Sequence, residues 1–167
     1  MKTLNQCRFF MWYFSRFKVP LIGYLKPKLM QIDDTEIVIK VTLNRRSKNH
    51  LNSMYFGALS IGADLAGGLH GFYHAKQAKV KMSLAFKSFQ AEFLRRPETD
   101  VYFVCNQGEI VKEMVQKSKI SGERINQPIE VNAYINYPKT PETVARFILE
   151  LSLKVLPHSI DKPTFAL

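Results

Sequence analysis

Glycine is concentrated in one apolar segment of this chain, and that concentration limits the folds available to it. The residues Leu65, Leu69 and Phe72 keep helical spacing there, so the segment predicts a helix of about five turns with Ser53 near its start as N-cap. Each glycine costs a helix interior about 1 kcal/mol relative to alanine, so a close neighbour must offset the loss. That neighbour is either a curved sheet or a second copy of the helix. Five of the eight glycines lie in this segment: Gly57, Gly62, Gly67, Gly68 and Gly71.

Strand patterns surround this helix on both sides in the sequence. Apolar and polar residues alternate with a period of two, which is typical of strands with one buried face. The pattern shifts register near Ser88, as a bulge in a long strand does. A short helix at 109–119, ending before Gly122, interrupts the strands. The order predicts an α+β domain in which one sheet wraps the long helix, with strands at 37–43, 80–93, 101–105, 125–137 and 143–156.

The first thirty residues hold much of the excess positive charge. The chain has 24 basic and 14 acidic residues, a net charge of +10. This charge indicates an anionic partner, such as nucleic acid, a membrane surface or a phosphorylated small molecule. The first thirty residues contain no acidic residue and six basic ones: Lys2, Arg8, Arg16, Lys18, Lys26 and Lys28.

The same segment predicts an amphipathic helix that Pro20 interrupts. Its apolar run, from Phe9 to Phe14, is too short to span a membrane. The helix either covers the domain, lies on a membrane surface or gates a substrate site. We therefore divide the chain into an N-terminal helical segment (1–32), a main domain (33–160) and a C-terminal tail (161–167). One stripe of this helix collects Cys7, Phe10, Met11, Phe14 and Leu21.

Neither cysteines nor histidines predict a metal site or a disulfide framework. Cys7 and Cys105 are far apart in the sequence, and no histidine pair has the spacing and third ligand that a metal site needs. A reducing, cytoplasmic location fits this cysteine usage best.

Asp64 is the only carboxylate between Leu51 and Tyr73. Partial burial of this carboxylate would raise its pKa and suit it to act as a general base. Alternatively, it is solvated or hydrogen-bonded to a neighbouring amide. On a helix Asp64 shares its face with small residues, which predicts a pocket: Gly57, Ser60, Ile61, Gly68 and Gly71.

A series of short elements follows one order along the chain: Asn49, Asn52-Ser53, Tyr55-Phe56-Gly57, Asp64, Gly67-Gly68 and Phe93–Pro97. This series resembles the hotdog-fold thioesterase superfamily, and within it the PaaI-like branch and an uncharacterised relative. The resemblance covers about residues 33–156, and Tyr55 and Phe56 replace the histidine and first glycine of the family motif. It implies a curved antiparallel sheet wrapped around a long central helix.

The resemblance implies hydrolysis of acyl-coenzyme A thioesters by dimers, or dimers of dimers, whose active sites lie between protomers. Asp64 would act as base or nucleophile, and Asn49 would orient water or substrate. The backbone amides of Phe56 and Gly57 would polarise the thioester carbonyl. No cofactor is implied beyond the coenzyme A of the substrate. Further residues would line the substrate site: Ser53, His50, Tyr55, Ser60, Gly68, and Arg95 and Arg96 toward the phosphates of coenzyme A.

Helix geometry favours a shared site independently. Asp64 lies eight residues beyond Phe56, about 12 Å along a helix, so one chain cannot bring both to one carbonyl. Two helices running antiparallel about a two-fold axis would bring them together.

Two other functions remain open at this point. The Tyr55-Phe56 substitution favours a non-catalytic acyl-coenzyme A or lipid-binding protein. The net charge favours a basic protein that binds nucleic acid or a membrane surface, although a thioesterase needs no nucleic acid. Contact of the N-terminal helix with a membrane is compatible with each of these functions. The apolar residues of this segment could also cover an acyl tunnel: Phe10, Trp12, Phe14 and Leu21.

Overall fold

The computed structural model describes residues 2–157, and the predicted tail at 161–167 lies outside them. Helices and strands follow one another in the order α1 Lys2–Phe17, α2 Pro20–Leu25, β1 Lys28–Ile32, β2 Ile37–Val41, α3 Phe56–Gln77, β3 Lys81–Phe93, β4 Val101–Cys105, α4 Gly108–Ser121, β5 Ile125–Ile135 and β6 Glu142–Leu156.

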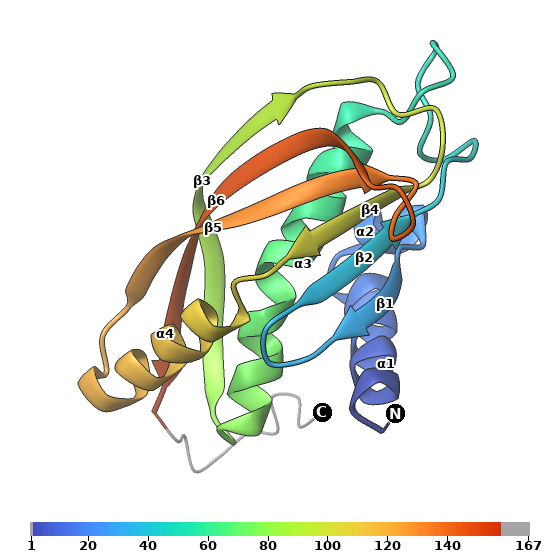
Figure 1. Ribbon diagram of the computed structural model, residues 1–167. Helices are drawn as coiled ribbons and strands as arrows, with labels where there is room; N and C mark the ends of the chain where they lie inside the picture. The colour runs from blue at the N-terminus through green and yellow to red at the C-terminus, as the bar shows by residue number, and fades with distance from the viewer. Residues whose placement is uncertain (1, 158–167) are drawn as a thin grey trace.

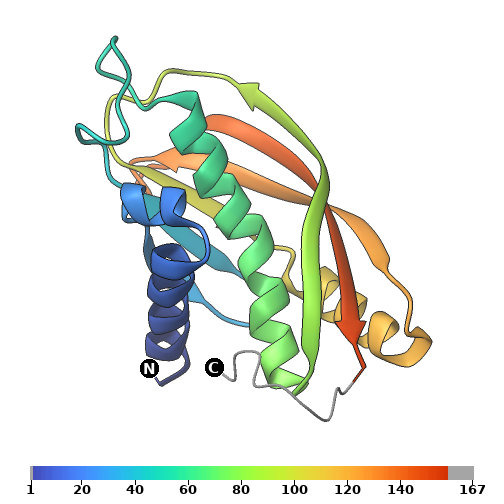
Figure 2. The same cartoon turned by 180° about the vertical axis from the view of Figure 1, so that it is seen from behind.

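One antiparallel sheet contains all six strands, in the order β1-β2-β4-β5-β6-β3. The sheet curves around α3, and α1 runs beside α3 on the same face (Figures 1 and 2). The short helix α4 connects β4 to β5 and lies on the side of the molecule away from α1 (Figure 1). The predicted α+β hotdog architecture, with its central helix, N-terminal helix and helical insertion, is confirmed.

The glycines of α3 fit against side chains of the sheet. A methyl group at Gly62 would overlap the ring of Phe103 on β4. One at Gly71 would crowd Leu84 and Met82 of β3. The sheet therefore supplies the close neighbour that the glycine pattern required, and a second helix is not needed to explain these positions.

The N-terminal segment breaks at Pro20, as predicted, and covers one side of α3. Phe10 and Phe14 pack on Phe72, with ring centroids 5.1 and 5.8 Å apart. Leu21 was expected on the same stripe but is 63% exposed, because α2 turns away from the axis of α1 after residue 19. No helix within residues 2–157 is long and apolar enough to cross a membrane.

β1 lies inside the segment that the sequence predicts to be helical (1–32), so this strand is a difference from the prediction. β1 pairs antiparallel with β2, and its register shifts between Leu29 and Gln31. That irregularity breaks the alternation of apolar and polar residues by which a strand is identified. The bulge predicted near Ser88 is confirmed, because the pairing of β3 with β6 shifts between Phe86 and Phe89.

Alanine substitution at two glycines distinguishes the effect of close packing on stability from the effect of helix propensity. We expect Gly62→Ala to lower the free energy of unfolding by about 1–3 kcal/mol, because its methyl group meets the buried Phe103 ring. Gly67→Ala should raise it by up to about 1 kcal/mol, since its methyl group would make ordinary contacts with Val131 and Leu149. Urea unfolding of both variants checks this, and shifts in the same direction would contradict it.

A second buried feature of α3 links stability to pH. His70 is fully buried beside the start of α4, and neither of its ring nitrogens forms a hydrogen bond within the described residues. Burial, together with the neighbouring His74, lowers the pKa of His70 to about 4 from 6.5. Between pH 6.5 and about 4, His70 is therefore protonated in the unfolded chain and neutral in the folded chain.

This difference predicts a loss of stability in mild acid. His70 contributes stability above its unfolded pKa, and that contribution disappears as the pH falls from 6.5 toward 4, by about 3 kcal/mol in total. We expect His70→Gln to reduce the difference in unfolding free energy between about pH 7 and about pH 4.5. The exposed His50→Gln variant is the control and should retain the wild-type difference.

Candidate active site

The loop before α3 is organised by Asn49. Its side-chain oxygen accepts hydrogen bonds from the backbone N–H of Leu51 (2.8 Å) and from both the N–H and the hydroxyl of Ser53 (3.3 Å each). Ser53 is buried within this loop, and the prediction that it caps the helix is wrong. The helix starts at Phe56 with Tyr55 in the N-cap position, because the Ser53 hydroxyl is engaged by Asn49.

The first two amides of α3 are free to bind a ligand. Tyr55 has no side-chain capping bond, and its carbonyl accepts from Ala58 and Leu59. Within the described chain, the N–H groups of Phe56 and Gly57 donate to no acceptor. They form the positive end of a helix of 22 residues, an arrangement that stabilises negative charge.

Two aromatic rings flank these amides. The rings of Tyr55 and Phe56 lie 4.6 Å apart between centroids, and both side chains are exposed. Tyr55 also covers the Cα of Gly57 so closely that a side chain there would overlap it. Relative to the motif of the PaaI-like branch that the sequence resembles, Tyr55 and Phe56 keep the backbone donors and add apolar surface around them.

Asp64 lies two turns further along α3. The carboxylate is half-buried, and burial raises its pKa above the usual aspartate value. It forms no hydrogen bond or ion pair within residues 2–157. Even the neighbouring Ser60 hydroxyl donates instead to the carbonyl of Phe56 (3.0 Å). A carboxylate with these properties is free to accept a proton from a water molecule.

The position of Asp64 relative to β3 follows from contacts on either side of it. Phe56 lies 6.3 Å from Phe93 between ring centroids, and Gly68 contacts Phe86. Asp64 is one turn before Gly68 and shares its helix face, so it lies on the side of α3 that faces β3. Phe89 and Phe93 rest on the buried Phe147, at 5.6 and 6.0 Å. The helix face that carries Asp64 is therefore directed toward the strand that bears this aromatic surface.

This surface lies at an open edge of the sheet. β3 is the last strand, and within the described residues it pairs only with β6. Phe89 is 42% and Phe93 47% exposed. In the single chain this aromatic surface is therefore open to a second molecule. The alternation in β3 predicted the strand but not that its apolar side chains remain exposed.

Arg95 and Arg96 follow β3 and lie close to the loop. The carbonyl of Pro97 accepts from the N–H of Met54 (2.8 Å), which joins this segment to the residues before α3. Arg95 forms an ion pair with Glu142, which partly neutralises it. Arg96 is exposed and has no partner in the described part of the chain. His50 is exposed on the loop.

Among residues 2–157, no group of three potential metal ligands comes together. Asn49, Ser53, Tyr55, Phe56 and Gly57 gather at the helix start, with Arg95 and Arg96 nearby. Ser60, Asp64 and Gly68 lie along the helix beyond them. The structure thus joins the predicted loop residues but separates Asp64 from the free amides within one chain.

The chain belongs to the family of the domain of unknown function DUF4442, whose family model matches residues 8–148. No curated protein matches it.

Solved structures share the fold at low sequence identity. A candidate thioesterase from Shewanella oneidensis superposes with a TM-score of 0.76 and 12% identity, covering 92% of this chain and 98% of that one. A protein of unknown function from Chlorobaculum tepidum gives 0.78 and 12%, covering 92% and 99%. A thioesterase family protein from Silicibacter pomeroyi gives 0.62 and 14%, covering 92% and 97%. The resemblance to the hotdog-fold thioesterase superfamily is confirmed at the level of the fold, and the PaaI-like branch stays a prediction.

Proposed function

We propose that this protein is a thioester hydrolase that acts, as a dimer or a dimer of dimers, on acyl-coenzyme A with a hydrophobic acyl group. The observation that carries the proposal is the state of Asp64. Its carboxylate is half-buried and unpaired, and it lies on the side of α3 that faces β3, whose aromatic residues are exposed. Fold neighbours that carry the name thioesterase support the same reaction class.

A second copy of the chain completes the site in this proposal. Asp64 and the free amide of Phe56 are separated by about 12 Å of helix, too far to act on one carbonyl. The two edges of the sheet favour one way of pairing. β1 is short, carries a bulge, and its Leu29 carbonyl accepts from the Arg8 side chain (3.0 Å). β3 is 13 residues long, so it is the edge that a second copy extends.

The reaction then divides between the two chains. The Asp64 carboxylate takes a proton from water as the water oxygen bonds to the thioester carbon. The carbonyl electrons move onto its oxygen, where the Phe56 and Gly57 amides of the other chain stabilise the negative charge. When the intermediate collapses, the carbon–sulfur bond breaks and the thiolate receives the proton from Asp64. Asn49 fixes the loop beside the amides, and Arg96 is available to the phosphates of coenzyme A.

A non-catalytic acyl-coenzyme A binding protein is the second candidate. The rings of Tyr55 and Phe56 crowd the start of α3, where the family motif has histidine and glycine. Such a protein would bind acyl-coenzyme A without releasing thiol. If calorimetry detects binding of acyl-coenzyme A, and acyl-coenzyme A of no chain length is hydrolysed, the result would support the binding protein against the hydrolase.

Replacing Asp64 tests the hydrolase directly. We expect Asp64→Asn to lower kcat for thiol release by at least about 100-fold, because the amide cannot accept the proton from water. In the wild type, kcat/KM should fall as the pH decreases. This fall should lie at a higher pH than an ordinary aspartate would give, since burial raises the pKa of Asp64. A thiol-detecting assay with acyl-coenzyme A of several chain lengths measures both.

The control is Glu113→Gln, which removes an exposed carboxylate of α4 far from Asp64 in the sequence. It should leave kcat unchanged. Turnover by Asp64→Asn equal to that of this control would show that Asp64 is not the base.

Mixing two inactive variants tests whether the site is shared. Phe56→Pro removes one amide donor at the first helical position, where proline is tolerated, and the extended backbone of Tyr55 suits a following proline. Mixed with Asp64→Asn and allowed to exchange subunits, it should restore about a quarter of wild-type activity. Half of randomly paired dimers are mixed, and each mixed dimer holds one intact site.

Phe56→Ala is the matched control, because it loses the ring and keeps the amide. It should retain more activity than Phe56→Pro. No recovery on mixing, in samples in which native mass spectrometry detects the mixed dimer, would mean that base and amides act within one chain.

A further inference from the structure

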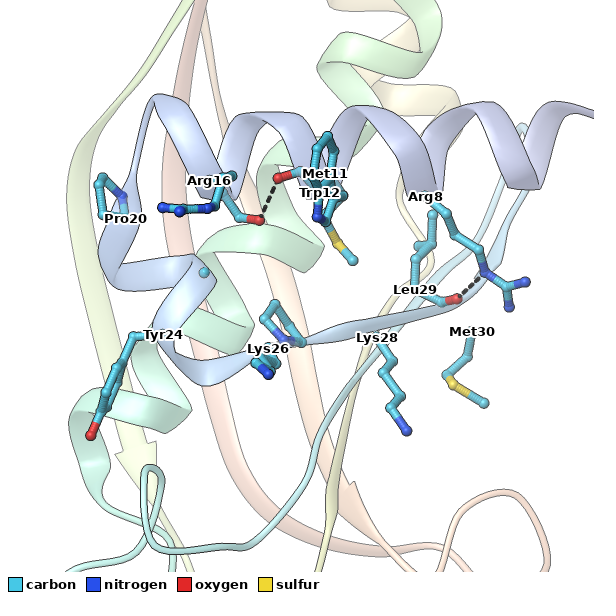
Figure 3. Close-up of a pocket in the computed structure, with 13 residues that line it drawn as sticks. Arg8, Met11, Trp12, Arg16, Pro20, Tyr24, Lys26, Lys28, Leu29 and Met30 are labelled. Atoms are coloured by element: carbon cyan, nitrogen blue, oxygen red, sulfur yellow. Dashed lines mark hydrogen bonds between the residues drawn. The ribbon is translucent and has the colours of Figure 1, made fainter.

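A groove lies between α1, α2 and β1, away from Asp64. Its volume is about 1060 Å³, and Met11 and Leu29 are among the residues that line it (Figure 3). This volume is at the upper end of the range for small-molecule sites. The groove is therefore large enough to take a chain of lipid size.

Basic side chains border the groove. Arg8, Arg16, Lys26 and Lys28 are exposed along it, and none of the 13 residues that line it is acidic (Figure 3). Arg46 adds a further positive charge beside the ring of Tyr24, at 5.6 Å from its centroid. The first acidic residue of the chain is Asp33, after β1. The groove therefore selects an anionic ligand.

Large apolar side chains project outward beside these cations. Trp12 is 56% exposed, and its ring lies 5.7 Å from Phe9 and 6.1 Å from Phe17. Tyr24 and Met30 extend this apolar surface from α2 and β1, and Met30 projects to the same side as Lys28 (Figure 3). Exposed aromatic rings among arginine and lysine are typical of helices that lie in a membrane interface.

Dimerisation through β3 would leave this face open. β1 and β3 are opposite edges of the sheet. Arg8 already occupies the Leu29 carbonyl of β1, so a second copy adds no strand there. A bilayer matches the combination of positive charge, projecting aromatic rings and an apolar groove better than a soluble polyanion does, because a polyanion leaves the apolar side chains in water.

We propose that α1, α2 and β1 dock this protein on a bilayer that contains anionic phospholipid. Arg16, Lys26 and Lys28 contact the headgroups, the rings of Phe9 and Trp12 enter the interface, and one lipid occupies the groove. The role of this docking rests on the proposed function, because docking would bring the hydrolase to acyl thioesters that partition into membranes.

Trp12 is the only tryptophan of the chain, so its fluorescence reports on this face alone. With vesicles of phosphatidylcholine and phosphatidylglycerol, the emission should shift to the blue, and lipids brominated on their acyl chains should quench it. Vesicles of phosphatidylcholine alone should bind at least about tenfold more weakly, and high salt should weaken binding to the mixed vesicles.

Charge reversal gives the matched comparison. Arg16→Glu with Lys28→Glu should weaken vesicle binding by roughly 30-fold or more. Lys117→Glu with Lys119→Glu, on exposed positions of α4, changes the net charge equally and should leave binding unchanged. Both double variants should hydrolyse a short, water-soluble acyl-coenzyme A as fast as the wild type does. A failure of docking is therefore distinguishable from a failure of the hydrolase.

Equal binding to both vesicle types would overturn the proposal, as would equal losses for the two charge reversals. A blue shift with dispersed short-chain phosphatidylglycerol, and none with vesicles, would show a soluble-lipid pocket instead of a docking face.

Discussion

The close contact between α3 and the concave face of the sheet determines the rest of the structure. Glycine at position 62 lets the ring of Phe103 reach the helix backbone, and Gly68 and Gly71 do the same for β3. β3 is therefore packed on the side of α3 that carries Asp64. The same packing that stabilises the fold therefore creates the low-polarity surroundings that raise the pKa of Asp64.

The two edges of the sheet are finished in different ways, and this difference separates two surfaces. At β1 the strand is short, bulged and bound by Arg8 from α1. At β3 a long strand leaves backbone groups and the rings of Phe89 and Phe93 exposed. A partner chain can extend only the second edge without displacing an existing contact. In the proposed dimer the first edge, with its cations, stays open to the bilayer that we propose as its partner.

Local patterns predicted much of this fold. Glycine spacing and period-two alternation identified α3 and the bulged β3, and Gly122, with its left-handed backbone, ends α4 as expected. What the sequence could not provide depends on residues far apart in it. The pairing of Arg95 with Glu142, 47 positions away, and the side chain of Asn49 that removes Ser53 from the helix cap are examples. The openness of β3 is another, since it depends on the order of strands.

The substitutions at Tyr55 and Phe56 have a narrower effect than the family motif suggests. The proposed oxyanion donors are backbone N–H groups, so replacing the side chains leaves both donors in place at the start of α3. What changes is the space around them, because Tyr55 covers Gly57 and Phe56 faces Phe93. An acyl chain that reaches the amides must pass these rings. In the proposed hydrolase the substitutions therefore act on which acyl groups enter, while the stabilisation of the oxyanion depends on the helix itself.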